Sequence, residues 1–414
     1  MTFPKVFRMK QELEGPRVVN ILGAVHDTMR SLGLQEQVKP GQTVAITAGS
    51  RGIANIDGIT RAVVDELKSL GLQPFIVPAM GSHGGATGEG QRAILAHYGI
   101  TEASMACPIK ASMDVVEIGK TKGTTVFCDK NAWEADHIVV VGWVNAHPDF
   151  SGEIESGLFK MMAIGLGKQE GAEHYHRAGQ HYSYAEIFPL VGRTVLDTGH
   201  VLCGLGILQN GYGETARVKA LLPRDFESGE KALLREAKAW KPRLPFEAID
   251  LLIVDEMGKN INGAGMDPLV IGRPTIQKPA DRPRIRHLFV RDLTPESEGN
   301  AIGIGFADMT TWKLVRKIDY AAMYMNGITS SDTHDSKVPM AFDTDRDAIR
   351  TALNMNGLTP PEQARVVRIK NTLLLTEMDA SESMLAEVQA NRRLSRITDP
   401  MPLTFDGSGG LLPF

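Results

Sequence analysis

Histidine and lysine gather in one glycine-rich segment of the chain, residues 145–176. It holds two lysines, the first of which is Lys160, and three histidines, His147, His174 and His176. Histidine is a general base near neutral pH and the commonest metal ligand, and lysine forms covalent bonds with carbonyl-type carbons. The segment follows an apolar run, 137–144, that is typical of a buried strand. This combination favours an active site over a surface loop.

The spacing within this segment restricts which side chains can meet. A straight helix would place Lys160 and His176 ~24 Å apart, so they share a site only if the chain turns back between them. We expect that turn at Gly165–Gly167. His174 and His176 are two positions apart and point to different sides of a helix, so at most one should face the site. The alternative role for one of them is to cap a helix C-terminus, where an imidazolium is favoured.

A second candidate loop, residues 79–90, lies between a predicted strand and a predicted helix. It has five glycines within ten residues, and Gly81, Gly84 and Gly85 let a ligand approach the backbone closely. His83 is flanked by small residues and has no neighbouring apolar side chain to pack under, which favours a functional role. The glycine spacing does not match the dinucleotide-binding fingerprint.

Two further loops follow predicted strands. The turn 47–52 carries Ser50 and Arg51 at the carboxyl end of a strand, where open α/β sheets bind ligands. The planar guanidinium of Arg51 suits a carboxylate or a phosphate, and a surface ion pair is an equal alternative. Lys259 lies in a polar loop of the second half of the chain. It either completes a site for an anion or is a solvated surface lysine, and the two interpretations are equal.

Short β-branched runs alternate with amphipathic patterns through the first 240 residues. Predicted strands are 44–47, 75–79, 115–118, 125–128, 138–143 and 201–208, and predicted helices are 17–31, 58–70 and 90–97. In the helix 58–70, Ile59, Val63 and Leu67 recur on one face. Strand, glycine-rich turn, helix and strand in this order favour a parallel sheet covered by helices.

A chain of 414 residues is too long for one ordinary core, so we expect two domains. Two prolines in the stretch 241–245 resist both helix and sheet and mark the boundary. Beyond it the pattern restarts, with strands at 251–254, 287–290 and 366–369 and helices at 312–326, 346–353 and 383–391. The predicted fold is two α/β domains, 1–243 with the candidate catalytic histidines and 244–414 closing the cleft. Each has a mainly parallel sheet covered by helices, and the active site lies in the interdomain cleft.

The bulk composition excludes several classes of function. The formal net charge is -4, which gives no electrostatic reason to expect nucleic acid or an anionic membrane as partner. The three cysteines are far apart, which argues against a zinc ribbon, an iron–sulfur cluster or a disulfide scaffold. The N-terminus lacks the apolar core of a signal peptide, and no apolar run is long enough to span a bilayer. We expect a soluble, cytoplasmic protein.

The order of these residues resembles the nickel-dependent lactate racemase family, of which the chain would be a divergent member. The shared pattern is an arginine after the first long strand, Gly-x-His after the second, and then His…Lys…His, which here are Arg51, Gly81–His83, His147, Lys160 and His176. Such enzymes use a nickel-pincer nucleotide, a pyridinium-derived mononucleotide that carries nickel. The resemblance implies a racemase or epimerase of a 2-hydroxy acid that works by reversible hydride transfer to this cofactor.

Carried over residue by residue, the resemblance implies a role for each candidate. Lys160 would hold the cofactor through a thioamide, and His176, or else His174, would ligate the nickel. His83 and His147 would be the two bases on opposite faces of the substrate. The remaining roles would be cofactor binding by Ser50, Gly81, Gly84 and Gly85, a grip on the substrate carboxylate by Arg51, and a second-domain contact by Lys259. Other proteins would assemble the cofactor, so a recombinant preparation can lack it.

The chain departs from the family pattern at two places. The family's Asp-x-Thr-Arg turn is Ala48-Gly-Ser-Arg51 here, and Leu158-Phe159 replaces Gly-Pro before Lys160. These changes favour a 2-hydroxy acid other than lactate, larger or more polar. Two alternatives stay open. One is a hydro-lyase or aldolase that acts on a hydroxy acid with zinc or another divalent ion held by His147, His174 and His176, and the other is a cofactor-binding homologue without turnover. The oligomeric state is also open, a homo-oligomer included.

Overall fold

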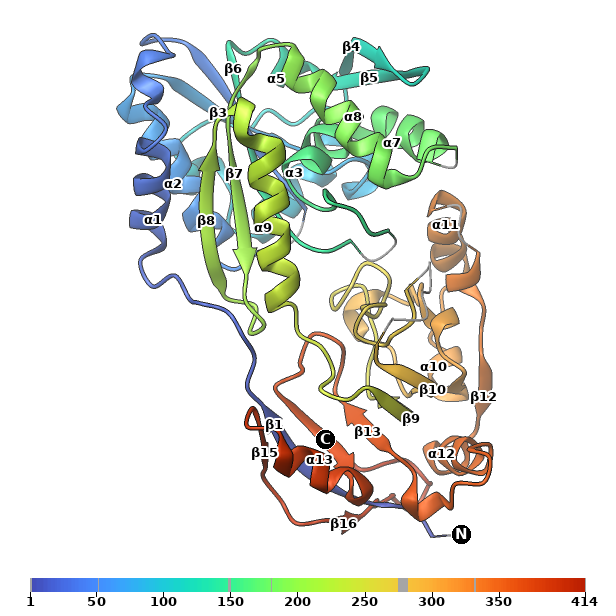
Figure 1. Cartoon of the computed structure of the whole chain (residues 1–414). Coiled ribbons are helices and arrows are strands. Elements are labelled where there is room, and N and C mark those ends of the chain that lie inside the picture. The colour runs from blue at the N-terminus through green and yellow to red at the C-terminus, as the bar shows by residue number, and fades with distance from the viewer. Residues whose placement is uncertain are drawn as a thin grey trace. The chain divides into compact units, whose positions relative to one another are not determined.

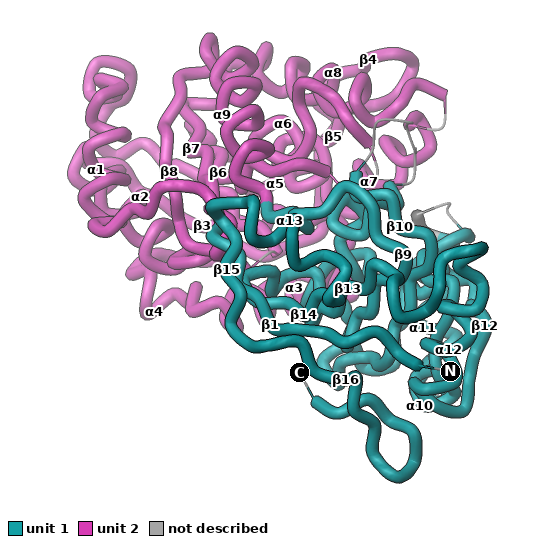
Figure 2. Tube along the Cα trace, turned by 60° about the horizontal axis from the view of Figure 1, so that its bottom comes forward, with its two compact units in different colours: residues 1–13, 242–414 teal, residues 14–241 magenta. Residues whose placement is uncertain are grey.

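The computed structural model describes residues 2–50, 52–147, 150–179, 181–274, 282–330 and 333–413. The chain forms two compact units, which Figure 2 shows in different colours. One unit is residues 14–241, and the other joins residues 1–13 to residues 242–414. The N-terminal strand therefore belongs with the C-terminal part of the chain.

The described part of residues 14–241 is built on a five-stranded sheet, in the order β3-β2-β6-β7-β8. Its strands are β2 (Thr43–Ala48), β3 (Gln73–Pro78), β6 (His137–Trp143), β7 (Val201–Gln209) and β8 (Thr215–Leu221). The first four strands of that order are parallel, and β8 returns antiparallel to β7. The carboxyl ends of β2, β3 and β6 therefore lie at one edge of the sheet. A separate hairpin joins β4 (Val115–Thr121) to β5 (Thr124–Asp129).

Helices cover both faces of this sheet (Figure 1). They are α1 (Ile21–Arg30), α2 (Ile56–Ser69), α3 (Gly88–His97), α4 (Glu102–Met105), α5 (Lys130–Trp133), α6 (Leu158–Lys160), α7 (Leu166–Gly179), α8 (Tyr184–Asp197) and α9 (Phe226–Trp240), with a π-helix at Met161–Gly165 between α6 and α7. Alternate residues of β2 serve the two faces, because side chains along a strand alternate. Val44 and Ile46 pack with α1 and α2, whereas Ala45 packs with residues of α6, α8 and α9.

Among the described residues of the second unit, a nine-stranded sheet runs β12-β11-β10-β9-β13-β14-β1-β15, with β16 also paired to β1. Its strands are β1 (Lys5–Gln11), β9 (Ala248–Val254), β10 (Arg284–Val290), β11 (Met309–Thr311), β12 (Met340–Phe342), β13 (Val366–Ile369), β14 (Glu377–Ser381), β15 (Leu394–Arg396) and β16 (Met401–Pro402). Strands β12 to β13 in this order are parallel, and the others are antiparallel. The helices are α10 (Trp312–Val315), α11 (Tyr320–Ser330), α12 (Asp345–Asn354) and α13 (Leu385–Ala390).

The predicted α/β class is confirmed, with two mixed, largely parallel sheets. Two predicted helices differ from the observed ones by more than two residues at one end or more. The helix expected at 17–31 begins at Ile21, because the side chain of Asn20 accepts a hydrogen bond from the amide of Gly23 and caps it. The helix expected at 312–326 is two helices, α10 and α11, and the side chain of Asp319 accepts from the amide of Ala322 at the start of the second. In the described ranges, no helix is long and apolar enough to cross a membrane.

Candidate functional site

The loops that follow β2, β3 and β6 meet at one edge of the five-stranded sheet, against the helical segment that starts at Leu158. A Cβ atom added to Gly49, in the first loop, would lie 3.1 Å from the side chain of Met161. A Cβ atom added to Gly81, in the second, would lie 3.0 Å from the side chain of Ile164. Both loops therefore pack closely on the π-helix that follows Lys160.

Lys160, His147 and His176 come together at this edge. Nζ of Lys160 lies 2.6 Å from Nε2 of His147. His176 is linked to His147 through the aromatic rings of Phe150 and Tyr184. Nδ1 of His176 lies 3.2 Å from the hydroxyl of Tyr184, at the start of α8. The ring of Phe150 stacks on His147 with centroids 4.4 Å apart and also contacts Tyr184.

The surroundings of His176 keep its imidazole neutral. Burial lowers its pKa below the ordinary value, and the positive charge of Lys160 lowers the pKa further. A neutral imidazole with one nitrogen held by a hydrogen bond is the form in which histidine ligates metals. His176 thus has the protonation state that a metal ligand needs.

The helical segment between Lys160 and His176 is broken, so the two residues do not lie at opposite ends of one straight helix. The break falls at Lys168, whose φ of 54° and ψ of -154° are not helical. The expected turn at Gly165–Gly167 was therefore misplaced, because Gly165 closes the π-helix and Gly167 lies within α7. Lys168 is fully buried, and its ammonium group forms an ion pair with Asp129. The residue at the break is thus held by a buried ion pair.

His83 lies in the neighbouring loop, after β3. Its Nδ1 is 2.5 Å from the hydroxyl of Ser50, which follows β2. Gly81, Gly84 and Gly85 have φ values of 61°, 68° and 64°, a conformation that glycine adopts readily, so the sharp turn requires them. Arg51 lies outside the described residues.

The N-terminal part of the sequence matches a known family model. Residues 5–186 match the model of the lactate racemase N-terminal domain. This part of the chain is a lactate racemase N-terminal domain. Among solved structures, it is similar to the lactate racemase apoprotein from Thermoanaerobacterium thermosaccharolyticum, with 13% sequence identity, a TM-score of 0.53, and coverage of 87% of this chain and 94% of that one. This likeness supports a common fold. No curated protein matches the sequence.

His174 does not join the group that the family pattern picks out. Its Nδ1 is 2.9 Å from the carbonyl oxygen of Glu170, and its ring contacts Phe127 of β5. Between the two histidines, the buried Tyr175 accepts a hydrogen bond from the amide of Phe127, which fixes this side of α7 against β5. Over the described ranges, no three His, Cys, Asp or Glu side chains are arranged to hold a metal ion. The zinc triad of His147, His174 and His176 therefore has no support in this geometry.

Two buried carboxylates support the family's site residues and were missed in the sequence. Glu155 accepts hydrogen bonds from the amides of His147, at 2.7 Å, and Gly152, at 2.8 Å. Glu230, on α9, accepts from the amides of Leu158 and Phe159, at 2.7 and 3.1 Å, just before Lys160. The signal for Glu230 was its position on the apolar face of α9, beside Phe226 and Leu233, where a solvated carboxylate does not belong.

Lys259, the nearest counterpart of the family's second-domain lysine, lies in the other unit. Its Nζ donates to the carbonyl oxygen of Gly263 and to Oδ1 of Asn326, both at 2.9 Å. Its amide donates to the hydroxyl of Ser297. These contacts hold the side chain within its own unit, and its catalytic role stays a prediction.

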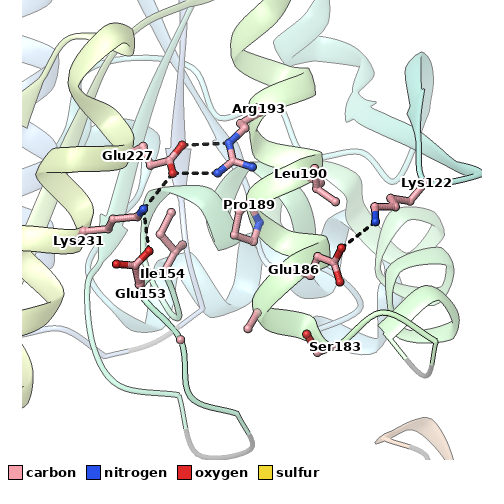
Figure 3. A pocket seen from close by; sticks show the side chains of 12 residues that line it. Lys122, Glu153, Ile154, Ser183, Glu186, Pro189, Leu190, Arg193, Glu227 and Lys231 are labelled. Atoms are coloured by element: carbon pink, nitrogen blue, oxygen red, sulfur yellow. Dashed lines mark hydrogen bonds and ion pairs between the residues drawn. The ribbon is translucent and has the colours of Figure 1, made fainter.

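A surface hollow of about 450 Å³ lies beside α8 and α9 (Figure 3). Its charged side chains pair with one another: Arg193 with Glu227, Lys231 with Glu227 and Glu153, and Lys122 with Glu186. Among the described residues that line it, none is a histidine. The hollow therefore lacks the histidines found at the sheet edge.

Proposed function

We propose that the chain is a racemase or epimerase of a 2-hydroxy acid that works with a nickel-pincer nucleotide. The observation that carries the proposal is the contact of Lys160 with His147, which Phe150 and Tyr184 link to His176, in a chain with a lactate racemase N-terminal domain. A primary amine and a neutral imidazole are the two groups needed for a covalent tether and a nickel ligand. A further imidazole beside them supplies a base.

The residues present fit this cofactor. Lys160 would hold it covalently, and His176 would ligate nickel through Nε2, since Tyr184 occupies Nδ1. When bound, the cofactor supplies an electrophilic ring that accepts a hydride from carbon. Hydride removal suits a 2-hydroxy acid, because the C–H bond beside a hydroxyl and a carboxylate is a poor proton donor.

The histidines manage the hydroxyl proton. His147 takes this proton as the substrate carbon becomes planar, and His83 returns one when the opposite face is reduced, or the reverse. The ammonium group of Lys160 lies against Nε2 of His147. A lysine nitrogen in a thioamide carries no charge, so tethering leaves His147 available as a base. The hydroxyl of Ser50 orients His83 through Nδ1.

One departure from the family pattern has a structural explanation. Leu158 and Phe159 are fully buried in the hydrophobic core, so their replacement of Gly-Pro changes packing rather than substrate contacts. The turn Ala48-Gly-Ser50 is the departure that lies at the sheet edge. We infer that this turn, where the family's aspartate is absent, shifts the preference away from lactate toward another 2-hydroxy acid.

The test is chirality exchange on a panel of 2-hydroxy acids labelled with deuterium at C2, using protein produced with the family's cofactor-making proteins. The proposal predicts inversion with the deuterium kept on carbon, since a transferred hydride does not exchange with water. Loss of the label to solvent would contradict it.

The variants His83→Ala and His147→Ala should keep nickel and lose inversion. His97→Ala is the matched control, because His97 is exposed on α3. Full activity in either site variant would contradict the two-base scheme. Nickel retention without inversion in the unaltered protein, on every acid tested, would indicate a cofactor-binding homologue instead.

A further inference from the structure

We propose that Lys168 is a positioning residue of this site, acting through its buried ion pair with Asp129. The pair holds the break in the helical segment that brings Lys160 and His176 together. Through a neighbouring glutamine, the same network holds the turn that carries His83. The roles of the site residues rest on the proposed function, whereas their placement by Lys168 is a property of the chain without cofactor.

The ion pair is completely withdrawn from solvent. Nζ of Lys168 lies 2.8 Å from Oδ2 of Asp129, and both side chains are 0% exposed. Nζ also donates to the carbonyl oxygen of Pro78, at the end of β3. Oδ1 of Asp129 accepts from the amide of Ala132 and caps α5. One ammonium group thus connects the end of β5 and the end of β3 to α7, which packs against β5 (Figure 1).

The backbone of Lys168 shows that this position is constrained. A φ of 54° with a ψ of -154° is a conformation that residues other than glycine rarely adopt. Such a conformation persists where the surroundings fix it, and here the side chain is fixed at its far end by Asp129 and Pro78. A glycine at this position would adopt the same backbone conformation without strain. What the lysine offers instead is the set of contacts that its ammonium group makes.

The break lies midway between the two residues that must meet. Lys168 is eight positions from Lys160 and eight positions from His176. An unbroken helix would hold these two ~24 Å apart. In the structure Lys160 contacts His147, and the rings of Phe150 and Tyr184 link His147 to His176. The backbone conformation at Lys168 therefore decides whether Lys160, the proposed tether, and His176, the proposed nickel ligand, lie at one site.

The network extends to the second loop through Gln91 of α3, which is fully buried. Its Oε1 lies 3.5 Å from Nζ of Lys168. Its amide nitrogen donates to the carbonyl oxygens of Gly81, at 2.8 Å, and His83, at 3.2 Å. The turn that carries His83 is therefore tied to the group that holds the break.

A purely stabilising role does not explain this choice of residues. A buried ion pair is often no more stable than apolar residues of the same volume, because desolvation of two charges offsets their attraction. The pair also fixes geometry, because acceptors on three separate elements must lie around one ammonium group. We therefore expect its removal to change geometry at the site more than it changes the stability of the fold.

The experiment compares histidine ring spectra of ¹⁵N-labelled protein without cofactor. The double variant Lys168→Gly/Asp129→Asn removes both charges, leaves no buried charge unpaired, and lets the backbone adopt its bend without strain. The ring signals of His83 and His176, assigned from the His83→Ala and His176→Ala spectra, should both shift, while thermal unfolding stays cooperative. Unchanged signals for both rings in a folded double variant would overturn the proposal. If this variant does not fold, Lys168→Met/Asp129→Asn keeps the side-chain volume and is judged by the same spectra.

A second variant separates the two arms of the network. Gln91→Ala should shift the ring signal of His83 and leave that of His176 in place. An unmoved His83 signal would refute the link through Gln91. The matched control is Val63→Ala, a core change on α2 that lowers stability without touching the network, and it should leave both signals unchanged. In cofactor-loaded protein, a displacement of 1 Å costs about 10²-fold in rate, so kcat of the double variant should fall by about that factor with little change in KM.

Discussion

The carboxyl group of Glu230 gives a prediction whose size follows from its surroundings. The side chain is completely buried on α9, and burial raises its pKa from 4.5 to about 8, although the amides of Phe159 and Leu158 donate to it and oppose the rise. Between these pH values the folded chain keeps a proton that the unfolded chain releases. The stability from this group is therefore fully present below pH 4.5 and is lost as the pH rises through about 8.

The loss is about 1.4 kcal/mol for each pH unit, which amounts to about 3 kcal/mol by pH 7, because pH 7 is about 2.5 units above 4.5. In Glu230→Gln the amide oxygen accepts from the same two amides and no proton is exchanged. We expect the variant to be more stable than the unaltered chain by about 3 kcal/mol at pH 7 and equally stable near pH 4.5.

The assay is urea unfolding at about pH 5, 7 and 8.5, followed by tryptophan fluorescence. Three of the four tryptophans, Trp133, Trp143 and Trp240, lie in the unit 14–241 and Trp312 lies in the other, so the signal reports mainly on the first unit. Equal pH dependence for the variant and the unaltered chain would refute the reasoning, because it would mean that Glu230 is ionised when folded.

The matched control for this assay is Glu227→Gln on the same helix. Hydrogen bonds from Arg193 and Lys231 lower the pKa of Glu227 to about 2. Its contribution is present above pH 4.5 and is lost as the pH falls toward 2, outside the range measured. The Glu227 side chain is 38% exposed, so its ion pairs contribute at most ~1 kcal/mol. We expect no change of slope between pH 5 and 8.5.

Three other substitutions test the supports of the site. Glu155→Ala should lower the free energy of unfolding in urea by about 2 kcal/mol, because the amide of His147 loses a charged acceptor. Unchanged stability would mean that other contacts hold the loop. Gly81→Ala should cost about 1–2 kcal/mol, since its φ is 61°, and unchanged stability would count against that conformation. Tyr184→Phe should weaken nickel retention about 10- to 100-fold through His176, and full retention on dialysis would contradict this orienting role.

Sequence patterns predicted the elements that are defined by local repetition. The apolar stripe of Ile59, Val63 and Leu67 is the buried face of α2, and the predicted strands of the first half appear as β2 to β7. The loops with His83 and His147 each follow a predicted strand, and because β3 and β6 run parallel, both loops lie at one edge of the sheet. Each of these inferences needs only neighbouring residues.

Features that depend on distant partners could not be predicted. In our proposal the break at Lys168 depends on Asp129, which lies in the β4–β5 hairpin, whereas the sequence pointed to nearby glycines. Glu230 is explained by the amides of Leu158 and Phe159, far back in the chain. The strand β1 pairs with β14, β15 and β16 near the other end of the chain. Long-range pairings of this kind leave no periodic signal.

The most direct measurement of the central claim is the mass of the peptide that contains Lys160, from protein made together with the family's cofactor-making proteins. The account predicts a nucleotide-derived addition on Lys160, retained in His83→Ala and His147→Ala. A preparation that inverts a 2-hydroxy acid while Lys160 is entirely unmodified would contradict it.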